Sequence, residues 1–396
     1  MKVIQINSTC GIGSTGKIAN AISALLDKDG INNRIIYSNL TNGYEKGISC
    51  SNGSYIKFQA FKSRIYGNYG FNSKLATKKM ICEIEKFSPD FVILHNIHGH
   101  DCNLELLFNY FKKSNIKLYW VFHDCWAFTG YCTHFTMDKC NKWIDNCNNC
   151  VQRKKFSWFF DRSSELYCKK KELFSGLNLT IITPSVWLRN LVTKSFFNNY
   201  EIKVINNGID LNVFCPRPSD FRKKNGILKN QFMLLGVSLG WSIQKGIDVF
   251  IELANRLDVD KYKIVLVGTD DKLDRILPKN IISIHRTQNQ QQLAEIYSAA
   301  DLYVNPTREE NFPTVNIESI SCGTPVITFN TGGSPEIIDE SCGKVVECDD
   351  IDGLESNIID ILNNNRYSTH ACIKRASLFN KDDKFMEYIK IFKGNL

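Results

Sequence analysis

The segment PTREENFPTVNIESISCG carries two acidic residues, Glu310 and Glu318, on either side of a predicted helix start. Pro313 suits the first turn of a helix, where its missing N–H leaves no hydrogen bond unmade. Free amides at a helix start, here with those of Asn311 and Phe312 nearby, can receive a diphosphate. Glu318 lies inside the helix, where a carboxylate can accept both hydroxyls of a ribose. Glu310 precedes the helix, close to whatever the diphosphate carries, so the segment predicts a nucleotide-sugar site.

A second candidate phosphate site is the glycine-rich stretch near the N-terminus. Residues 11–17, GIGSTGK, match the pattern G-x-x-x-x-G-K of a P-loop, but Ile18 stands where a serine or threonine should hold magnesium. A P-loop NTPase and a purely structural strand-to-helix turn are two alternatives. We favour a third, in which Gly13 and Gly16 bring the backbone close to a ligand's phosphate or sugar.

Histidines follow two predicted strands. His98 comes shortly after the apolar run DFVILH, while His123 ends the run KLYWVFH and Asp124 follows it. Open α/β sheets bind ligands at the carboxyl ends of their strands, so these side chains are candidate site residues. The alternative for each of them is an ordinary loop histidine. His285–Asn289 follow another strand and are expected to recognise the base of the nucleotide.

Four of the fifteen cysteines are clustered. Four thiolates that end in C-x-x-C suit a tetrahedral structural zinc ion, while free thiols and disulfides are the alternatives. The N-terminal apolar run is too short for a signal peptide, which favours an intracellular chain with reduced thiols. The clustered residues are Cys132, Cys140, Cys147 and Cys150.

The elements that must position these residues form two successive series of alternating strands and helices. Continuous apolar runs such as 90–95 and 117–123 are typical of buried parallel strands. The pattern restarts with a strand at 232–237, which predicts a second doubly wound α/β domain. We place an N-terminal domain at 1–215 with a Cys-rich insert at about 125–155, a polar linker at 216–230, a C-terminal domain at 231–380 and a last helix within 381–396.

Composition and charge narrow the class of protein. The chain has 396 residues, of which 43% are hydrophobic and 23% charged, and this excludes a disordered or repetitive protein. The net charge of +8 is uneven: residues 1–215 have 27 Lys and Arg against 16 Asp and Glu, a balance of +11. Such a domain suits an anionic membrane surface or a phosphate-bearing acceptor, although a merely solvated surface is the simpler alternative. No nucleic-acid recognition motif is present, so no nucleic-acid partner is expected.

Several motifs together resemble the retaining glycosyltransferases of family GT4. The E-x7-E segment is followed by CGTPV from Cys322 and by GGSPE from Gly332, as in the donor site of that family. INNGID at 205–210 resembles the end of the N-terminal domain, and QKG at 244–246 resembles the lysine loop of the second domain. The resemblance spans nearly the whole chain and implies a GT-B fold, with two Rossmann-like domains facing across a cleft and a last helix that crosses back to the first domain.

The resemblance also implies roles for single residues. Lys245 would neutralise the departing diphosphate, Glu318 would bind the ribose, and Glu310 would contact the donor sugar. His123 would position the donor sugar, and Gly16 would bring the N-terminal loop to the donor. His98 and Asp124 are weaker candidates for the acceptor side. Many members place an arginine shortly before the lysine. This chain has no arginine there. The side chain of Ser242 or Gln244 is therefore expected to bind the phosphate in its place, as a neutral donor.

The expected reaction is retaining transfer of a sugar from a nucleotide diphosphate to a growing bacterial glycan, with no cofactor required for the chemistry. The segment HDCWAFTGYC resembles a subgroup that builds O-antigen, capsule or exopolysaccharide. That implies a lipid-linked oligosaccharide acceptor and a cytoplasmic enzyme at the inner face of the plasma membrane. The alternatives are a GT-B nucleotide-sugar epimerase, a P-loop NTPase and a non-catalytic nucleotide-sugar-binding protein.

Overall fold

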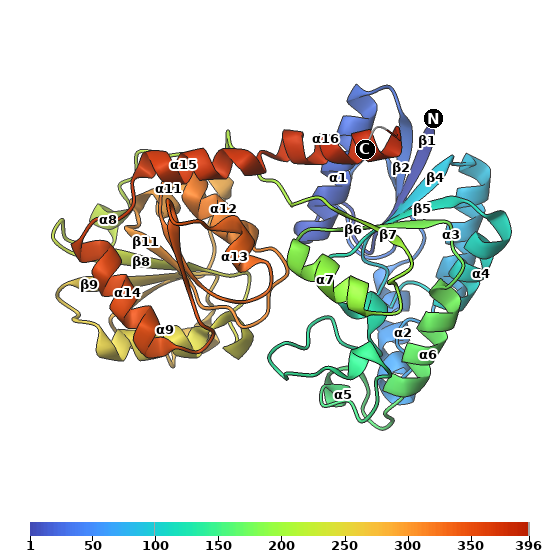
Figure 1. The fold of residues 1–396 in the computed structure, drawn as a ribbon, viewed down its shortest axis with the longest axis horizontal. Helices are drawn as coiled ribbons and strands as arrows, with labels where there is room; N and C mark the ends of the chain where they lie inside the picture. Colours follow the sequence, from blue (N-terminus) through green and yellow to red (C-terminus); the bar gives the residue numbers. More distant parts are fainter. Residues whose placement is uncertain (99, 395–396) are drawn as a thin grey trace. The chain divides into compact units, whose positions relative to one another are not determined.

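The computed structural model describes residues 1–98 and 100–394. The chain divides into two compact units, of which unit 1 comprises Met1–Ile205 with Phe385–Leu396 and unit 2 comprises Asn206–Lys384 (Figure 1). Each unit contains one parallel β-sheet with helices on both faces, which confirms the predicted α/β class with two doubly wound domains. No helix in the described part of the chain combines the length and the apolar character needed to cross a membrane.

Unit 1 has a seven-stranded sheet in the order β3-β2-β1-β4-β5-β6-β7, with every pairing parallel. Its strands are β1 (Lys2–Ile6), β2 (Asn32–Tyr37), β3 (Gly47–Ser49), β4 (Phe91–Leu94), β5 (Lys117–Val121), β6 (Leu179–Thr183) and β7 (Glu201–Val204). Its helices are α1 (Gly13–Lys28), α2 (Gly53–Tyr66), α3 (Lys74–Phe87), α4 (Leu104–Ser114), α5 (Arg153–Phe156), α6 (Ser163–Phe174) and α7 (Val186–Lys194), with short 3-10 turns η1 (Trp126–Phe128) and η2 (Lys142–Ile144).

The core of unit 1 follows the period of two in its strands. Val92 and Leu94 of β4 face the cluster that contains α4, while Phe91 and Ile93 face the cluster that contains α1. The second cluster also receives the apolar face of α16 (Lys381–Phe392), whose Phe392 ring lies 5.0 Å from that of Phe91. Residues 395–396 of the predicted last segment lie outside the described residues.

Unit 2 has a six-stranded parallel sheet in the order β10-β9-β8-β11-β12-β13. Its strands are β8 (Phe232–Val237), β9 (Tyr262–Val267), β10 (Ile281–Ile284), β11 (Leu302–Asn305), β12 (Val326–Phe329) and β13 (Gly343–Val346). Its helices are α8 (Phe221–Lys224), α9 (Ile247–Arg256), α10 (Asp271–Asp274), α11 (Gln290–Ala299), α12 (Thr314–Ser321), α13 (Ser334–Ile337), α14 (Ile351–Asn363) and α15 (Thr369–Ala376), with 3-10 turns η3 (Ile243–Lys245) and η4 (Ser377–Phe379).

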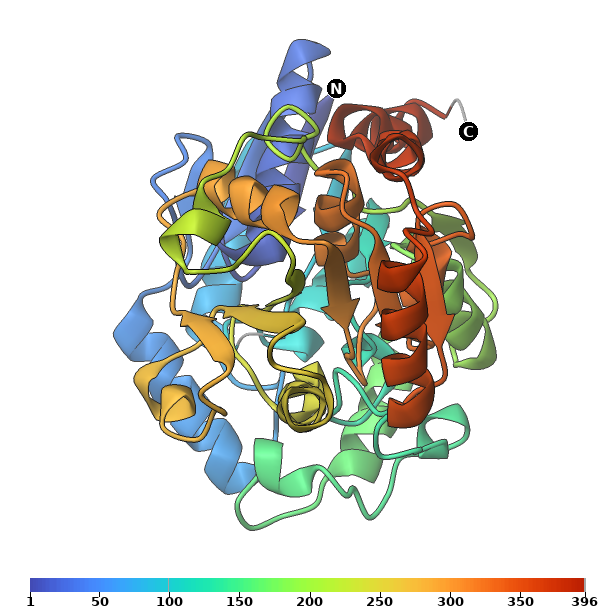
Figure 2. The ribbon, with the colours of Figure 1, turned by 90° about the vertical axis from the view of Figure 1, so that its left-hand side faces the viewer.

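Helices cover both faces of this second sheet (Figure 2). Leu266 and its alternate neighbours pack against α9 and α14, whereas Val265 and Val267 pack on the side of α11, α12 and α15. The strands of unit 2 are therefore apolar on both sides, as buried parallel strands must be.

The segment 216–230, expected to be a linker, is instead packed into unit 2. Ile227 is 6% exposed and belongs to a core cluster of that unit. Arg222, at the start of α8, forms an ion pair of 2.8 Å with Asp301. The polar composition that suggested a linker reflects side chains that bind back to the domain, because Arg222 also donates to the carbonyl oxygen of Ala299.

Candidate functional site

Lys245 and Glu310 meet beside two neighbouring strands of unit 2. β8 leads into η3, which ends at Lys245, and β11 leads into the loop that contains Glu310. β8 and β11 pair in parallel where the strand order changes direction, and open α/β sheets bind ligands at such a switch point. The Lys245 Nζ lies 2.7 Å from the Glu310 Oε2. The fold thus brings the predicted cation against the predicted sugar-contacting carboxylate.

Arg308 holds the lysine loop in place. Its guanidinium donates to the carbonyl oxygen of Ile243 at 2.5 Å, to both carboxylate oxygens of Asp248 at 2.8 and 2.7 Å, and to Asp349 at 2.6 Å. The Arg308 side chain therefore holds η3 in position through these hydrogen bonds. Sequence reasoning missed it, because its acidic partners are 60 and 41 residues away along the chain.

The two residues expected to replace the missing arginine lie in the same loop. Gln244 donates its side-chain amide to Glu309 at 2.7 Å, so this amide already has a carboxylate partner. Ser242 begins the turn, and its carbonyl oxygen accepts the Lys245 N–H at 2.9 Å. Both residues shape the loop that presents Lys245.

The helix α12 begins just after Pro313, as predicted. Its N-cap residue is Pro313, which makes no side-chain capping bond, and the Asn316 N–H donates to the Pro313 carbonyl oxygen at 3.1 Å. The positive end of the helix dipole lies at this terminus. Glu318 lies inside the helix, and its Oε2 accepts the hydroxyl of Tyr297 at 3.1 Å. Burial and the nearby Glu318 raise the pKa of Tyr297, so the phenol stays protonated and orients that carboxylate.

The residues between Glu310 and α12 have different surroundings from those predicted. The Asn311 N–H donates to the Glu310 Oε1 at 3.2 Å, so this amide supports the carboxylate. Phe312 is 4% exposed and packs against Phe379 with ring centroids 5.9 Å apart. Gly332 approaches the loop from β12: it has a φ of +58°, and a Cβ there would lie 1.6 Å from the Glu310 carbonyl oxygen. Only glycine fits at this position.

In unit 1 the glycine-rich loop leads from β1 into α1, which begins at Gly13. Gly16 fits under the loop, because a Cβ there would lie 2.8 Å from the Thr9 Oγ1. Lys17 is exposed, whereas Ile18 is 7% exposed and belongs to the core. A core isoleucine occupies the place of the magnesium-binding hydroxyl, which argues against the P-loop alternative.

The half-buried His123 is linked to two buried side chains, Gln5 and His95. Gln5 donates its amide to the Ala19 carbonyl oxygen at 2.9 Å, which leaves the Gln5 Oε1 to accept from the His95 Nε2 at 3.0 Å. The His95 Nδ1 then accepts from the His123 Nε2 at 3.2 Å. Burial lowers the pKa of His95 well below its ordinary value. His123 is thereby set in the tautomer that carries its proton on Nε2.

His98 and Asp124 form a second pair on the same side of the sheet. The His98 Nε2 lies 2.8 Å from the Asp124 Oδ2, and the Trp126 N–H donates to the other oxygen at 2.8 Å. Burial opposes the charge on both groups, but their interaction outweighs it. The pKa of Asp124 falls to about 2, and the pKa of His98 lies above its ordinary value. Asp124 thus favours the protonated form of His98, whereas burial favours the neutral form of His123.

Acid is expected to destabilise the fold through His123. Burial is the main cause that lowers its pKa to about 4, with Asp124 opposing and His98 assisting, whereas the ordinary value is 6.5. Below pH 6.5 the imidazole of His123 is protonated in the unfolded chain but stays neutral in the folded chain. The free energy of unfolding therefore falls as the pH falls, by about 2 kcal/mol at pH 5. Urea unfolding at pH 7 and pH 5 should show a smaller loss for His123→Gln than for the wild type. His370→Gln, at an exposed histidine, is the control and should lose as much unfolding free energy as the wild type. An equal loss in His123→Gln and the wild type would contradict the prediction.

Two of the four clustered cysteines lie at the distance expected of metal ligands. The Sγ atoms of Cys132 and Cys150 are 3.8 Å apart, and a tetrahedral zinc site with Zn–S bonds of about 2.3 Å has sulfurs about 3.8 Å apart. The Gly130 N–H donates to the Cys147 Sγ at 3.2 Å. Across the described residues no three sulfurs lie within 4.8 Å of one another, and Cys140 is partly buried against the same core. The four cysteines are free thiols, and only Cys132 and Cys150 among them are at the distance of two ligands of one metal ion.

A buried lysine lies beside these thiols. The Lys170 side chain is fully buried, and its Nζ donates to the carbonyl oxygens of Trp126 and Thr129 at 2.8 and 3.0 Å. Burial lowers the pKa of Lys170, while the thiol of Cys147 and the carboxylate of Asp124 act against this. A cation in such surroundings needs compensating negative charge, and a zinc ion with four thiolates carries a net charge of −2.

We therefore predict about one zinc ion per purified chain, held by the clustered cysteines. Elemental analysis by mass spectrometry after dialysis measures this directly. Cys147→Ser should lose the metal and lower the melting temperature, because structural zinc sites contribute to folding. Cys168→Ser, at an exposed cysteine outside the cluster, should keep it. A wild-type protein without zinc, or equal zinc in both variants, would favour free thiols.

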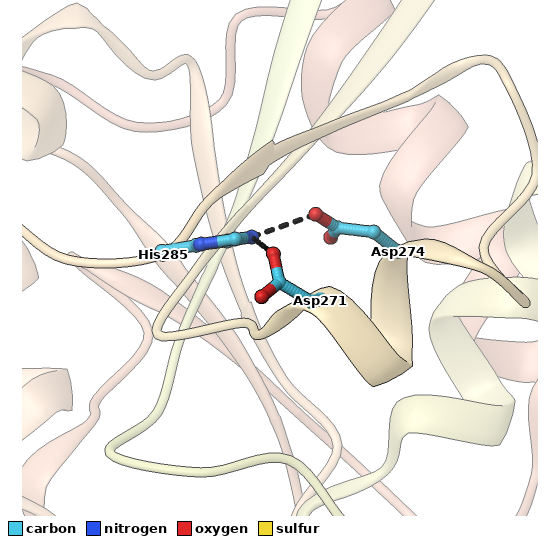
Figure 3. Close-up of side chains that lie close together, drawn as sticks. All are labelled: Asp271, Asp274 and His285. Carbon is cyan, nitrogen blue, oxygen red and sulfur yellow. Dashed lines mark hydrogen bonds and ion pairs between the residues drawn. The ribbon is translucent and has the colours of Figure 1, made fainter.

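A group of three polar side chains follows β9 and β10. The His285 Nε2 lies 2.6 Å from Asp274 and 4.0 Å from Asp271 (Figure 3). The side-chain bond to Asp274 raises the pKa of His285. All three residues are exposed and already pair with one another, so we assign no metal to them. His285 begins the stretch expected to recognise the base, and this expectation stays a prediction.

Part of the chain matches the model of a known family. Residues 219–379 match the model of the family "Glycosyl transferases group 1". The putative colanic acid biosynthesis glycosyl transferase WcaC of Escherichia coli is 22% identical over 384 residues, which cover 89% of this chain and 88% of the relative.

Two solved structures show the same fold over nearly the whole chain. Sucrose-phosphate synthase from Thermosynechococcus elongatus is 16% identical, with a TM-score of 0.72 over 99% of this chain and 98% of its own. HepE from Anabaena in complex with UDP-glucose is 14% identical, with a TM-score of 0.68 and full coverage of both chains. Residues 219–379 therefore match the glycosyl transferases group 1 family, and the chain has the GT-B fold of two Rossmann-like units.

Proposed function

We propose that this enzyme transfers a hexose-type sugar, with retention of configuration, from a nucleotide diphosphate to a growing bacterial surface polysaccharide. The observation that carries the proposal is the pairing of Lys245 with Glu310 at 2.7 Å beside the helix that bears Glu318. The cation and the helix start match the diphosphate of a sugar nucleotide, and the two carboxylates match its ribose and its hexose.

Each of these groups has a distinct task. The N–H groups at the start of α12 bind the diphosphate, and Lys245 stabilises the negative charge that develops on it as the bond to the sugar breaks. Glu318, oriented by Tyr297, accepts the ribose hydroxyls. When the diphosphate binds, it replaces Glu310 as the partner of Lys245. The Glu310 carboxylate then accepts hydrogen bonds from the hydroxyls of the sugar.

The retaining step forms one bond and breaks one bond at the anomeric carbon. The acceptor hydroxyl attacks from the face on which the diphosphate leaves, its proton passes to the departing phosphate oxygen, and the carbon keeps its configuration. No base on the protein is needed for this transfer. Stabilisation of the leaving diphosphate is therefore the main contribution of the protein.

Unit 1 supplies the residues of the acceptor side in this proposal. Neutral His123, held by His95, positions the sugar through hydrogen bonds, while His98 and Asp124 bind the acceptor. The loop with Gly13 and Gly16 contributes backbone contacts to the donor. The acceptor is a polyprenyl-diphosphate-linked oligosaccharide at the inner face of the membrane, as in assembly of O-antigen, capsule or exopolysaccharide. The similarity to a relative named for colanic acid biosynthesis supports this setting.

The donor is tested with a thermal-shift panel of UDP-, GDP- and ADP-sugars, beginning with UDP-glucose, since HepE binds that compound. A bound donor raises the melting temperature by mass action. The stabilising donor is then incubated with lipid-linked oligosaccharides, and NMR of the product gives the anomeric configuration. Conversion of the donor without any acceptor would indicate an epimerase or hydrolase. Donor binding without transfer to any acceptor would indicate a binding protein.

A further inference from the structure

Exposed aromatic side chains gather in one region of unit 1, which we call the aromatic surface. They come from α2 and from the loop that follows α5, two segments about ninety residues apart at the same end of the unit (Figure 1). Their exposed fractions lie between 47% and 67%. Among residues 1–98 and 100–394, every exposed Phe, Tyr and Trp belongs to this set. Its members are Phe58, Phe61, Tyr66, Trp158, Phe159 and Phe160.

The aromatic surface is built on a fixed backbone. The Trp158 N–H donates to the carbonyl oxygen of Arg64 at 2.7 Å, and the rings of Phe61 and Trp158 lie 5.8 Å apart. Arg153 donates to the Trp158 carbonyl oxygen at 2.9 Å. Tyr131 donates its buried hydroxyl to the carbonyl oxygen of Gly67, at the end of α2, at 2.8 Å. These hydrogen bonds fix the backbone that carries the exposed rings.

Basic residues surround these rings. The segments 53–67 and 151–162 contain seven Lys and Arg residues and one acidic residue, Asp161. The Lys62 ammonium lies 5.9 Å from the centre of the Phe58 ring, and the Arg162 guanidinium lies 5.8 Å from that of Phe160. Asp161 accepts the N–H groups of Cys150 and Ser163 at 2.6 and 2.9 Å, so its charge is used within the loop.

Aromatic rings with basic neighbours match an anionic bilayer. Trp and Tyr favour the headgroup level, where the ring is in an apolar layer and the polar group reaches water. Phe belongs to the apolar face of segments that lie in the membrane interface. Each Lys or Arg near an anionic leaflet adds attraction. A protein partner is less suited, because the centres of protein interfaces are depleted in lysine. Stacked nucleic-acid bases are also less suited, since the planes of Phe61 and Trp158 meet at 79° and offer no parallel platform.

We propose that the aromatic surface docks the enzyme on anionic membranes, with its rings at headgroup depth and its lysines and arginines on the lipid phosphates. This deepens the proposed function, since a lipid-linked acceptor requires the enzyme to work at a bilayer. It assigns the membrane contact to α2 and the loop 157–160, which the uneven charge of the sequence alone did not locate.

The test is co-sedimentation of the full chain with vesicles of phosphatidylcholine alone or with about 30% phosphatidylglycerol, at about 50 mM salt. The wild type should sediment with the anionic vesicles and stay in the supernatant with the neutral ones. Phe58→Ser with Phe159→Ser should reduce binding about tenfold or more, because two rings leave the interface. Lys154→Gln with Lys155→Gln should do the same through lost attraction and should weaken the salt dependence. Leu75→Ser, at a residue of α3 that is 69% exposed, is the matched control and should bind like the wild type.

Circular dichroism and the donor-induced thermal shift show whether each variant is folded with an intact donor site. The proposal is overturned if the folded wild type ignores anionic vesicles, if neutral vesicles bind equally, or if the aromatic and control variants lose binding to the same extent. These outcomes are separate from the proposed function. Vesicle binding without any donor shift would disprove the donor assignment, and a donor shift without vesicle binding would disprove the docking surface.

Discussion

Lys245→Ala should lower kcat about 100- to 1000-fold, which is the usual cost of removing one group that stabilises charge in the transition state. The ammonium of Lys245 is the cation that the structure places against Glu310, beside the start of α12. Charge on the diphosphate grows as the glycosidic bond breaks, so the lysine contributes more to the transition state than to the bound donor. We expect the loss to appear in kcat more than in the dissociation constant of the donor. Single-turnover transfer from labelled donor, with calorimetric titration of the donor, measures both.

The control for this variant is Lys374→Ala, which removes an exposed lysine from α15 of the same unit. It should leave both constants unchanged. Arg308→Lys is an informative third variant, because lysine keeps the charge but cannot bind Ile243, Asp248 and Asp349 together. It should lower kcat in part by loosening the lysine loop. A Lys245→Ala enzyme with wild-type kcat would remove the basis of the proposed mechanism.

Glu318→Ala should weaken donor binding about 10- to 150-fold, since a hydrogen bond to a charged group contributes roughly 1.5–3 kcal/mol. The carboxylate of Glu318 already has an oriented position, because its Oε2 accepts the hydroxyl of Tyr297. Ribose hydroxyls do not change during transfer, so kcat at saturating donor should change little. Calorimetry with the nucleoside diphosphate alone gives the dissociation constant without turnover.

Two comparisons make the Glu318 prediction specific. Tyr297→Phe should weaken donor binding less than Glu318→Ala, because it removes only the group that orients the carboxylate. Glu295→Gln changes a carboxylate on the same helix as Tyr297 and should leave affinity unchanged. A 2′,3′-dideoxy nucleotide should bind wild type and Glu318→Ala equally, since it lacks the partner hydroxyls. If the variant still prefers the normal ribose, Glu318 does not bind that sugar.

Most of the fold could be predicted from local patterns. The strand predicted at 232–237 is β8, with the bounds that the structure has. Pro313 predicted the start of the helix that became α12, because the conformational preference of proline acts within one turn. The three-residue strand β3 was missed, since so short a segment carries too little periodicity. The segment 216–230 was misassigned because its polar side chains bind to distant partners.

The sequence alone determined the types of residue available for chemistry: an acidic pair around a helix start, a lysine after the first strand of the second series, and histidines after two strands. Only the tertiary structure decided which of them touch. In the structure Lys245 forms an ion pair with Glu310, and Arg308 forms one with Asp248. Lys170 is buried beside the thiols, and the ring of Phe61 contacts that of Trp158. The physical reason is range. Backbone preferences and burial patterns act over a few neighbouring residues and are therefore written in the local sequence. Ion pairs and ring contacts form between side chains that strand order brings together from 60 to 100 residues apart, and no local pattern records them.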